Sequence, residues 1–414
     1  MKRRYLVDVK LSAILFVVMF AFYSLIYMTK NCYNAAMAAI VAEGIMTKSQ
    51  TGLINAAFFL VYAPLQIVGG IAADRYSPHK LIAIGTFGAG IANLLIYFTQ
   101  NYVAMIIIWS LNAAVQFGVW PAVFKIISTE LTPKHCVTAV FYINLSGIIG
   151  LLLSYVFAIF ISDWKNHFLM SAIVLFCVTA IFHLSYTGIK KNMVTEEVST
   201  LRASEKENEK NKKGELFGLL IKSGLPFLFI VYMIHGMLNI GIKTVVPVMM
   251  MESYEGVSPS LANALNIILI LMGASGIFAA SIKIFRWFSE PAVIFAIFLI
   301  TVPLLLLITY VGRINIAVIV VVMAVVMLLF AAASTLFGQI SRVFAAYGFG
   351  ATVSGIFNCM ASVGVVISNY LFTRLADDYG WEITAKVWFF FAIFATALSM
   401  TAIPIWRNFV RKTK

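Results

Sequence analysis

The chain has 414 residues, of which 62% are hydrophobic and only 11% are charged, whereas soluble domains are about one quarter charged. This composition excludes a soluble globular domain and predicts an integral membrane protein. The formal net charge of +13 follows the membrane topology described below, so it does not indicate a nucleic-acid partner.

Apolar stretches of about 20 residues recur along the chain, and each is long enough to cross ~30 Å of hydrocarbon as a helix. We therefore predict an all-α integral membrane protein with twelve transmembrane helices in two pseudo-symmetric six-helix bundles. The predicted helices of the first half are 11–40, 52–73, 80–98, 102–126, 136–162 and 167–187. Those of the second half are 225–251, 259–284, 291–311, 314–338, 350–376 and 382–406.

The two halves are separated by a charged stretch rich in Lys, Glu and Asn, which is too polar to bury. We predict an N-terminal bundle over 1–187, a cytoplasmic linker over 188–222 and a C-terminal bundle over 223–414. When alternate loops are assigned to the cytoplasm from the N-terminus onward, most of the 30 lysines and arginines fall inside. This bias predicts a multi-pass cell-membrane protein with both termini in the cytoplasm. The exceptions are Lys30 and Lys243 within helices, and Lys48, Lys165, Arg313, Arg374 and Lys386 outside.

Lys30 lies about two-thirds of the way along the first apolar stretch. A lysine at a helix centre costs roughly 3 kcal/mol, so it should face a protein interior, a partner or a water-filled cavity. Tyr23, Tyr27, Lys30 and Asn34 follow at intervals of four, three and four residues, which places them on one helical face. This face predicts one wall of an anion site. The alternative is a lysine that extends to the membrane interface among an aromatic belt.

A similar face occurs on the seventh predicted helix. Tyr27, Met28, Lys30 and Asn34 align with Tyr232, Met233, His235 and Asn239, as expected of transporters built from repeated bundles. His235, Asn239 and Lys243 follow at four-residue spacing, so they share one face. This pattern predicts a second group of binding residues, in which Lys243 faces the outer vestibule. The alternative for His235 is a hydrogen bond between two helices.

The turn between the second and third helices reads GGIAADRYSPHK over residues 69–80. It resembles the signature GxxxDRxGRR of the major facilitator superfamily, with Gly70, Asp74, Arg75 and Lys80 at matching positions. The resemblance implies a conformational latch, in which a small residue allows close helix approach and a charge cluster holds one state.

Further residues resemble the organophosphate:phosphate antiporter branch of that family. Gln116, Trp120, Pro121 and Lys125 keep the spacing of its fourth helix. The two tyrosines before Lys30 and a third, Tyr62, twelve residues before Asp74, occupy the positions of its binding tyrosines. The resemblance implies that Gln116, Trp120 and Tyr62 join the substrate site, although Trp120 and Pro121 could equally serve packing and a helix kink.

Lysine stands where the branch has its first binding arginine, so a bidentate fork becomes a point charge. The place of the second arginine is taken by His235, or by Ile234 if the gap in the alignment lies elsewhere. Acidic residues fall only at predicted helix ends and loops, which leaves no carboxylate at mid-membrane and His235 as the one group at that depth that titrates near neutral pH. The sequence contains no nucleotide loop, metal constellation or nucleophile–base set, so we expect neither enzymatic activity nor a cofactor.

These features together predict a secondary transporter that moves a small organic anion across the bilayer by alternating access. The anion would be a phosphorylated sugar, glycerol phosphate or a sugar acid, bound by Lys30 and His235 and moved by anion exchange or proton-coupled symport. We expect a monomer. The alternative is a transporter-like membrane sensor of the same ligands. A facilitator of neutral sugars or drugs is disfavoured by the cationic residues within the helices.

Overall fold

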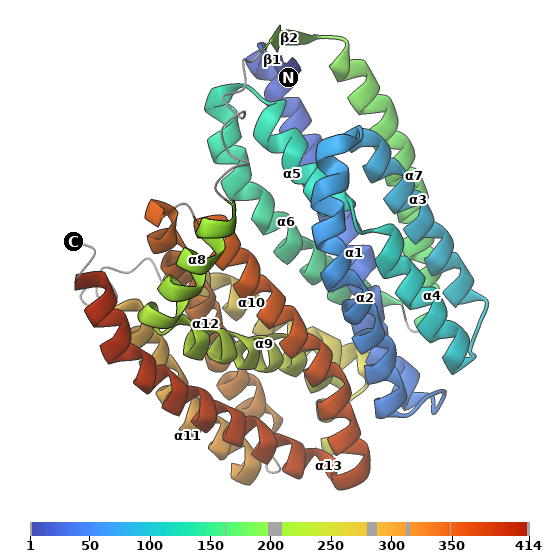
Figure 1. Ribbon diagram of the computed structural model, residues 1–414. Coiled ribbons are helices and arrows are strands. Elements are labelled where there is room, and N and C mark those ends of the chain that lie inside the picture. Colours follow the sequence, from blue (N-terminus) through green and yellow to red (C-terminus); the bar gives the residue numbers. More distant parts are fainter. Residues whose placement is uncertain are drawn as a thin grey trace. The chain divides into compact units, whose positions relative to one another are not determined.

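The structure is a computed structural model that describes residues 2–161, 163–197, 209–279, 288–311, 315–347 and 349–411. Almost all of it is helical (Figure 1), and the chain divides into two compact units. Unit 1 contains β1 (Lys2–Leu6), α1 (Val9–Ala42), α2 (Lys48–Arg75), α3 (Pro78–Tyr97), α4 (Tyr102–Val115), α5 (Val119–Thr129), α6 (Pro133–Phe160), α7 (Trp164–Lys190), β2 (Met193–Glu197) and the start of α10, Pro259–Ala264. The whole of α10 runs over Pro259–Ala279, and unit 2 contains it from Leu265 onward. The other elements of unit 2 are α8 (Glu209–Ser223), α9 (Leu225–Ser253), α11 (Glu290–Val311), α12 (Ile316–Val343), the 3₁₀ turn η3 (Phe344–Tyr347) and α13 (Gly350–Arg411).

The helices agree closely with the predicted ones, and the all-α membrane fold is confirmed. Among the described residues, ten helices are long and apolar enough to cross a membrane, and a shorter apolar stretch covers Leu145–Phe160 within α6. α13 consists of two helices that meet at Gly380, where φ is 81°. Glycine adopts this backbone conformation without strain, because it has no Cβ. The predicted number of twelve spans stays a prediction.

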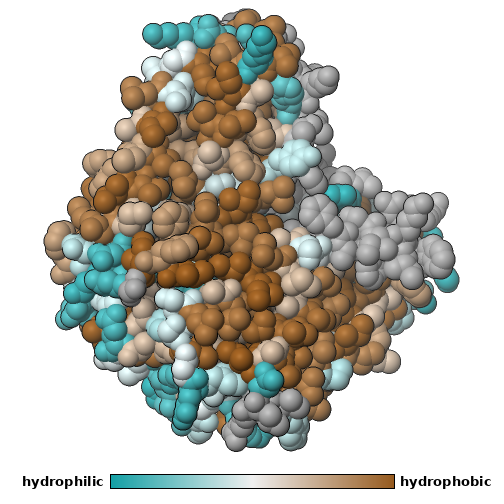
Figure 2. All heavy atoms as spheres, turned by 180° about the vertical axis from the view of Figure 1, so that it is seen from behind, coloured by the Kyte–Doolittle hydropathy of each residue, from teal (hydrophilic) through white to brown (hydrophobic). Residues whose placement is uncertain are grey.

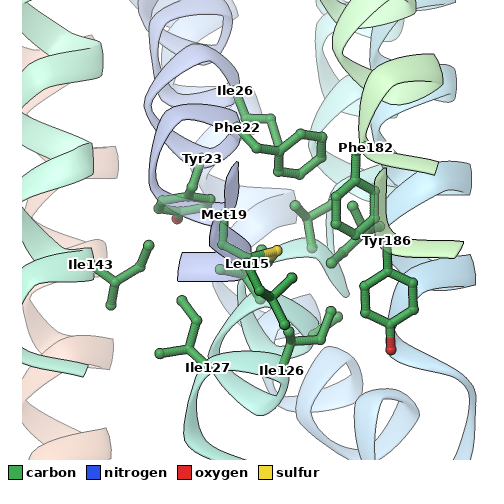
Figure 3. Close-up of a cluster of buried hydrophobic side chains, with 14 of the residues drawn as sticks. Leu15, Met19, Phe22, Tyr23, Ile26, Ile126, Ile127, Ile143, Phe182 and Tyr186 are labelled. Atoms are coloured by element: carbon green, nitrogen blue, oxygen red, sulfur yellow. The ribbon is translucent and has the colours of Figure 1, made fainter. Parts of the chain in front are cut away.

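In unit 1, α1 packs against α6 and α7, while α2 packs against α4 and α3 against α7. Figure 3 shows the side chains that fill this interior, with Phe22 of α1 stacked on Phe182 of α7 at 4.5 Å between ring centroids. In unit 2, α9 and α11 pack along α13. Two glycines make the α9–α13 approach close, because a Cβ on Gly236 or Gly364 would meet the backbone of the facing helix.

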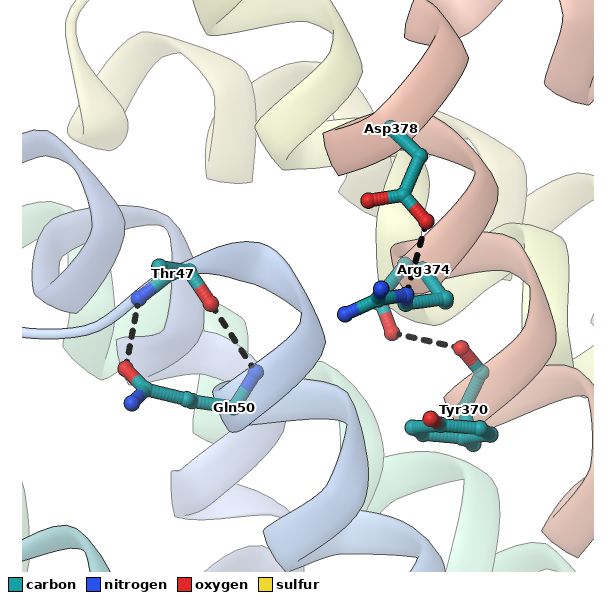
Figure 4. Close-up of polar contacts among 6 residues, drawn as sticks. Thr47, Gln50, Tyr370, Arg374 and Asp378 are labelled. Atoms are coloured by element: carbon teal, nitrogen blue, oxygen red, sulfur yellow. Dashed lines mark hydrogen bonds and ion pairs between the residues drawn. The ribbon is translucent and has the colours of Figure 1, made fainter.

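Side chains at the helix ends satisfy backbone groups that the helices leave open. At the start of α2, the Gln50 amide N–H donates to Thr47 Oγ1 at 3.2 Å, and the Thr47 amide N–H donates to Gln50 Oε1 at 3.0 Å (Figure 4). This capping box defines where α2 begins.

Figure 4 also shows an ion pair of 2.7 Å between Arg374 and Asp378, one turn apart near the middle of α13.

The predicted linker 188–222 contains more regular structure than its polar sequence indicates. α8 includes its last residues, and β2 pairs antiparallel with β1, so that Arg3 lies opposite Glu196 and Lys2 opposite Glu197. Figure 1 shows this ribbon at the end of unit 1 that carries the N-terminus. Neither strand was predicted from the sequence, because each is only five residues long and needs its distant partner strand to form. Residues 198–208 of the linker lie outside the described residues.

Large apolar side chains cover much of the surface. Leu60, Ile67 and Ile84 of unit 1 are 64%, 71% and 69% exposed, and the face in Figure 2 is mainly hydrophobic, with hydrophilic side chains gathered toward its margins. Soluble proteins rarely expose apolar patches of this extent. A bilayer solvates such a surface, and the helical backbone bonds satisfy the polar groups that lipid cannot.

Candidate substrate site

The ammonium of Lys30 lies among aromatic rings of α1 and α2. Its Nζ is 3.5 Å from the ring centroid of Tyr62 and 5.5 Å from that of Tyr27. Phe58 and Phe59 complete the group at 5.5 and 6.0 Å. Rings attract a cation through the negative face of their π-systems, by about 0.5–2 kcal/mol each depending on solvation. We call these four rings the aromatic cage of Lys30.

The alternative to an anion site was that Lys30 extends to the membrane interface. The direction of its side chain is relevant to this alternative. Ala42 is the nearer end of α1, roughly 18 Å away along the helix. The ammonium instead lies beside Tyr27, one turn toward the other end. Within the described residues, Lys30 makes no ion pair. The structure therefore holds an ammonium inside unit 1 with rings, rather than a carboxylate, as its neighbours.

Asn34 ties α1 to α2. The Asn55 Nδ2 donates to Asn34 Oδ1 at 2.8 Å, and the Asn34 Nδ2 donates to Asn31 Oδ1 at 3.3 Å. The Tyr33 hydroxyl adds a bond of 3.0 Å to the carbonyl of Thr51. These contacts fix the rotation of α1 against α2, which brings the aromatic cage to Lys30. They also occupy both polar atoms of the Asn34 side chain.

Tyr23 and Trp120 form an aromatic pair next to the cage. Their ring centroids are 4.8 Å apart, and the ring centroids of Tyr23 and Tyr27 are 5.9 Å apart. Tyr23 is 8% exposed and belongs to the hydrophobic cluster of unit 1 (Figure 3). The structure thus brings Tyr23, Tyr27, Lys30, Tyr62 and Trp120 into one continuous group.

The fourth predicted helix, 102–126, is broken at residues 116–118 between α4 and α5. Pro121 has no amide N–H, so the carbonyl of Phe117 lacks the helical partner it would otherwise have. Gln66 Nε2 of α2 donates to that carbonyl at 3.4 Å. The break supports the kink reading of Pro121. Gln116 is itself buried and donates to Asn112 Oδ1 at 2.7 Å, so its amide nitrogen is engaged within the protein.

In unit 2, His235 is held between helices. Its Nε2 lies 2.8 Å from the carbonyl oxygen of Phe330 on α12, and this pairing requires that Nε2 carries the proton and donates. The ring stacks on Tyr232 at 5.2 Å and is 3% exposed. Asn239 and Lys243 continue the same face of α9, as the spacing predicts, and both are partly buried.

The residues of the expected latch lie at the end of α2 and the start of α3. Arg75 and Lys80 are exposed, and the side chain of Asp74 lies outside the described residues. Among the described residues, a Cβ on Gly70 would have no neighbour within 4 Å, whereas one on Gly69 would meet the carbonyl of Phe117. The close approach expected at Gly70 therefore occurs at Gly69.

Two members of the cage, Phe58 and Phe59, were not identified from the sequence. The spacing of four residues from Phe58 to Tyr62 was the available signal. Lys125, which the spacing of the fourth helix singled out, lies away from the cage and donates from Nζ to the carbonyl of Ala73 at 2.5 Å. A cation at this place stabilises the C-terminus of α2, one turn or less from the latch.

Comparison with known proteins assigns these features to a family. The model of the Major Facilitator Superfamily matches residues 19–369. Membrane sensor protein UhpC of Salmonella typhimurium is 37% identical over 97 residues, 23% of this chain and 22% of that protein. A probable hexose phosphate transport protein of Chlamydia trachomatis is 25% identical over 114 residues, 28% of this chain and 25% of that protein. The glycerol-3-phosphate transporter of Bacillus subtilis is 25% identical over 168 residues, 38% of this chain and 37% of that protein.

Solved structures agree in fold across nearly the whole chain. A bacterial homologue of the human lysosomal transporter Spinster superposes with a TM-score of 0.75 at 14% identity, covering 97% of this chain and 99% of that chain. The nucleoside transporter NupG gives 0.69 at 15%, covering 96% and 99%. The matched stretches of the relatives named above span only about a fifth to two-fifths of their length. The superpositions therefore establish the fold, and the substrate has to be argued from the site.

Proposed function

Because the chain belongs to the Major Facilitator Superfamily, a family of membrane transporters and not of enzymes, we propose that it moves a small organic anion across the membrane by alternating access. The substrate is a phosphorylated sugar, glycerol phosphate or a sugar acid. Lys30 contacts its charged group, and the tyrosines around Lys30 donate hydrogen bonds to it.

The aromatic cage of Lys30 carries this proposal. A lysine at membrane depth costs roughly 3 kcal/mol, and the rings offset part of this cost while they leave the positive charge in place. A carboxylate would neutralise the charge. A caged ammonium instead remains able to attract an anion, and its hydrogen-bond donors are the groups that phosphate and carboxylate oxygens accept from.

The names of the relatives support the substrate class. They include a probable hexose phosphate transport protein and a glycerol-3-phosphate transporter. Both ligands in these names combine an anionic phosphate with hydroxyl groups. Binding of such an anion neutralises the ammonium, which lowers the cost of enclosing it away from water. This favours exchange or uptake of anions, and the coupling partner is either a counter-anion or a proton.

A second candidate is a membrane sensor of the same ligands, favoured by the likeness to membrane sensor protein UhpC. The ligand contacts would be the same, but the bound state would act on a partner protein instead of completing a transport cycle. Net uptake distinguishes the two functions.

The test is a ligand screen followed by a transport assay. The purified protein should show an increased melting temperature with glucose 6-phosphate, glycerol 3-phosphate or a hexuronate, because a ligand that binds only the folded state stabilises it. Any ligand that does so is then followed in proteoliposomes by counterflow. Binding with transport supports the transporter, and binding without transport supports the sensor. If no anion in the set shifts the melting temperature, the proposal is wrong.

We further propose that both termini lie in the cytoplasm of a cell-membrane protein, from the distribution of lysine and arginine. Single cysteines are introduced into a variant whose four natural cysteines are replaced by serine. Glu205→Cys, in the linker outside the described residues, and Val410→Cys should react with an impermeant maleimide only after the cells are permeabilised. Glu255→Cys, on the exposed turn after α9, is the matched control and should react in intact cells. Labelling of Glu205→Cys in intact cells would reverse the assignment.

A further inference from the structure

Two prolines open the same kind of gap in the backbone hydrogen bonding of the two units. Pro247 lies inside α9, and because it has no amide N–H, the carbonyl of Lys243 loses its helical donor. Asn266 of α10 supplies the missing donor, with its Nδ2 3.1 Å from the Lys243 oxygen. Pro121, Phe117 and Gln66 form the equivalent set in unit 1.

This contact fixes the orientation of the Asn266 amide. A carbonyl oxygen can only accept, so the atom that faces it must be the NH₂ group. The Asn266 Oδ1 consequently points elsewhere, and it has no hydrogen-bond partner among the described residues although Asn266 is 0% exposed. A buried acceptor without a partner costs about 1–3 kcal/mol, so native proteins keep few of them.

A second acceptor of this kind lies on α9. The Oδ1 of Asn239 is buried and has no hydrogen-bond partner within the described part of the chain, and Asn239 precedes Lys243 by one helical turn on the same face. The ammonium of Lys243 extends over Gly273, so that a Cβ placed on Gly273 would lie 3.5 Å from Nζ. Gly273 follows Asn266 by two turns of α10 and shares its face. The absence of a side chain there gives the ammonium its room.

His235 is less suited to contact a ligand. Its Nε2 proton is already donated to Phe330, and Ser334 Oγ lies 3.2 Å from the same nitrogen. The ring is enclosed by Tyr232, Phe330 and Phe337, with centroids at 5.2, 5.5 and 6.0 Å. Within the described part of unit 2, the buried amide oxygens without a partner therefore lie further along, at Asn239 of α9 and Asn266 of α10.

We infer that Asn239, Lys243 and Asn266 form a polyol-recognition cluster, in which the two amide oxygens accept hydrogen bonds from hydroxyl groups of the anion and Lys243 binds its oxygens. The inference rests on the proposed function and adds selectivity to it. An amide oxygen accepts a hydrogen bond only from a ligand that carries a donor, so the cluster favours hydroxylated anions over sulfate, which has no O–H group at neutral pH. A site that hydrogen-bonds a hydroxyl also rejects analogues that lack it, because its own polar groups then stay unpaired.

The test compares glucose 6-phosphate and glycerol 3-phosphate with sulfate, an oxyanion without a donor, by dissociation constants on the purified protein. Asn239→Leu removes one acceptor and leaves the Asn266–Lys243 bond intact. It should weaken binding of the two hydroxylated anions by about 2- to 10-fold, the value of one neutral hydrogen bond, and leave sulfate binding unchanged. Lys243→Met should weaken all three.

Thr244→Val is the matched control, because its hydroxyl is bonded to the carbonyl of Ile240 at 3.0 Å within the same helix. It should retain the parent's preference for hydroxylated anions. An equal loss for all three probes in Asn239→Leu, or no loss, would overturn the cluster while binding through Lys30 stands. If the parent binds none of the three probes, the proposed function fails with it.

Discussion

Lys30→Met should abolish most of the anion affinity while leaving the protein folded. Methionine keeps the length and apolar bulk of lysine and deletes the ammonium, so only the charged contact is lost. Truncating one partner of a buried ion contact costs on the order of 2–5 kcal/mol, or roughly 30-fold to several thousandfold in dissociation constant. The measurement is ligand affinity from thermal shifts or calorimetry, together with counterflow in proteoliposomes.

The stability of Lys30→Met should equal or exceed that of the parent, because a cation is removed from a site of low polarity. Lys30→Arg should retain binding, since the guanidinium fork suits both phosphate and carboxylate. Lys165→Met is the matched control: Lys165 also lies near a ring, 5.8 Å from Trp164, but at the start of α7. If Lys30→Met binds every anion as well as the parent does, Lys30 has no part in the site.

Gly150→Ala should destabilise unit 1 and weaken anion binding together. Gly150 of α6 faces α1 next to the cage, where a Cβ would lie 2.6 Å from Tyr27 Cβ and 2.9 Å from the Met28 amide nitrogen, and would also meet the carbonyl of Ser24. Two of these atoms are backbone, so α1 and α6 must move apart. Overpacking of this kind typically costs about 1–3 kcal/mol, which outweighs the ~1 kcal/mol gain in helix propensity.

Gly147→Ala, one turn away on the same face of α6, provides the comparison. Its Cβ would lie 3.6 Å from the Tyr27 ring, an ordinary contact, so this variant should be neutral or slightly more stable. Melting temperatures in detergent micelles measure both variants, and the ligand shift reports the anion site. Equal melting temperatures for the two variants would contradict the close α1–α6 packing.

Features that a single helix encodes could be predicted from the sequence alone. Length and apolar composition predicted the spans, because a backbone in lipid must satisfy its own hydrogen bonds. The spacing of Tyr23, Tyr27 and Lys30 placed them on one face of α1, since side chains three and four residues apart are neighbours on any helix. The turn containing Gly70 and Arg75 indicated the family, which the family model confirmed.

The contacts between helices became known only from the packed chain. The cage needs Phe58, Phe59 and Tyr62 of α2 at Lys30, and His235 bonds to a carbonyl 95 residues away. Helical periodicity specifies a face but not the rotation and register of its neighbour. Those depend on packing at positions such as Gly150, and on which carbonyls Pro121 and Pro247 leave open for a distant amide to bind.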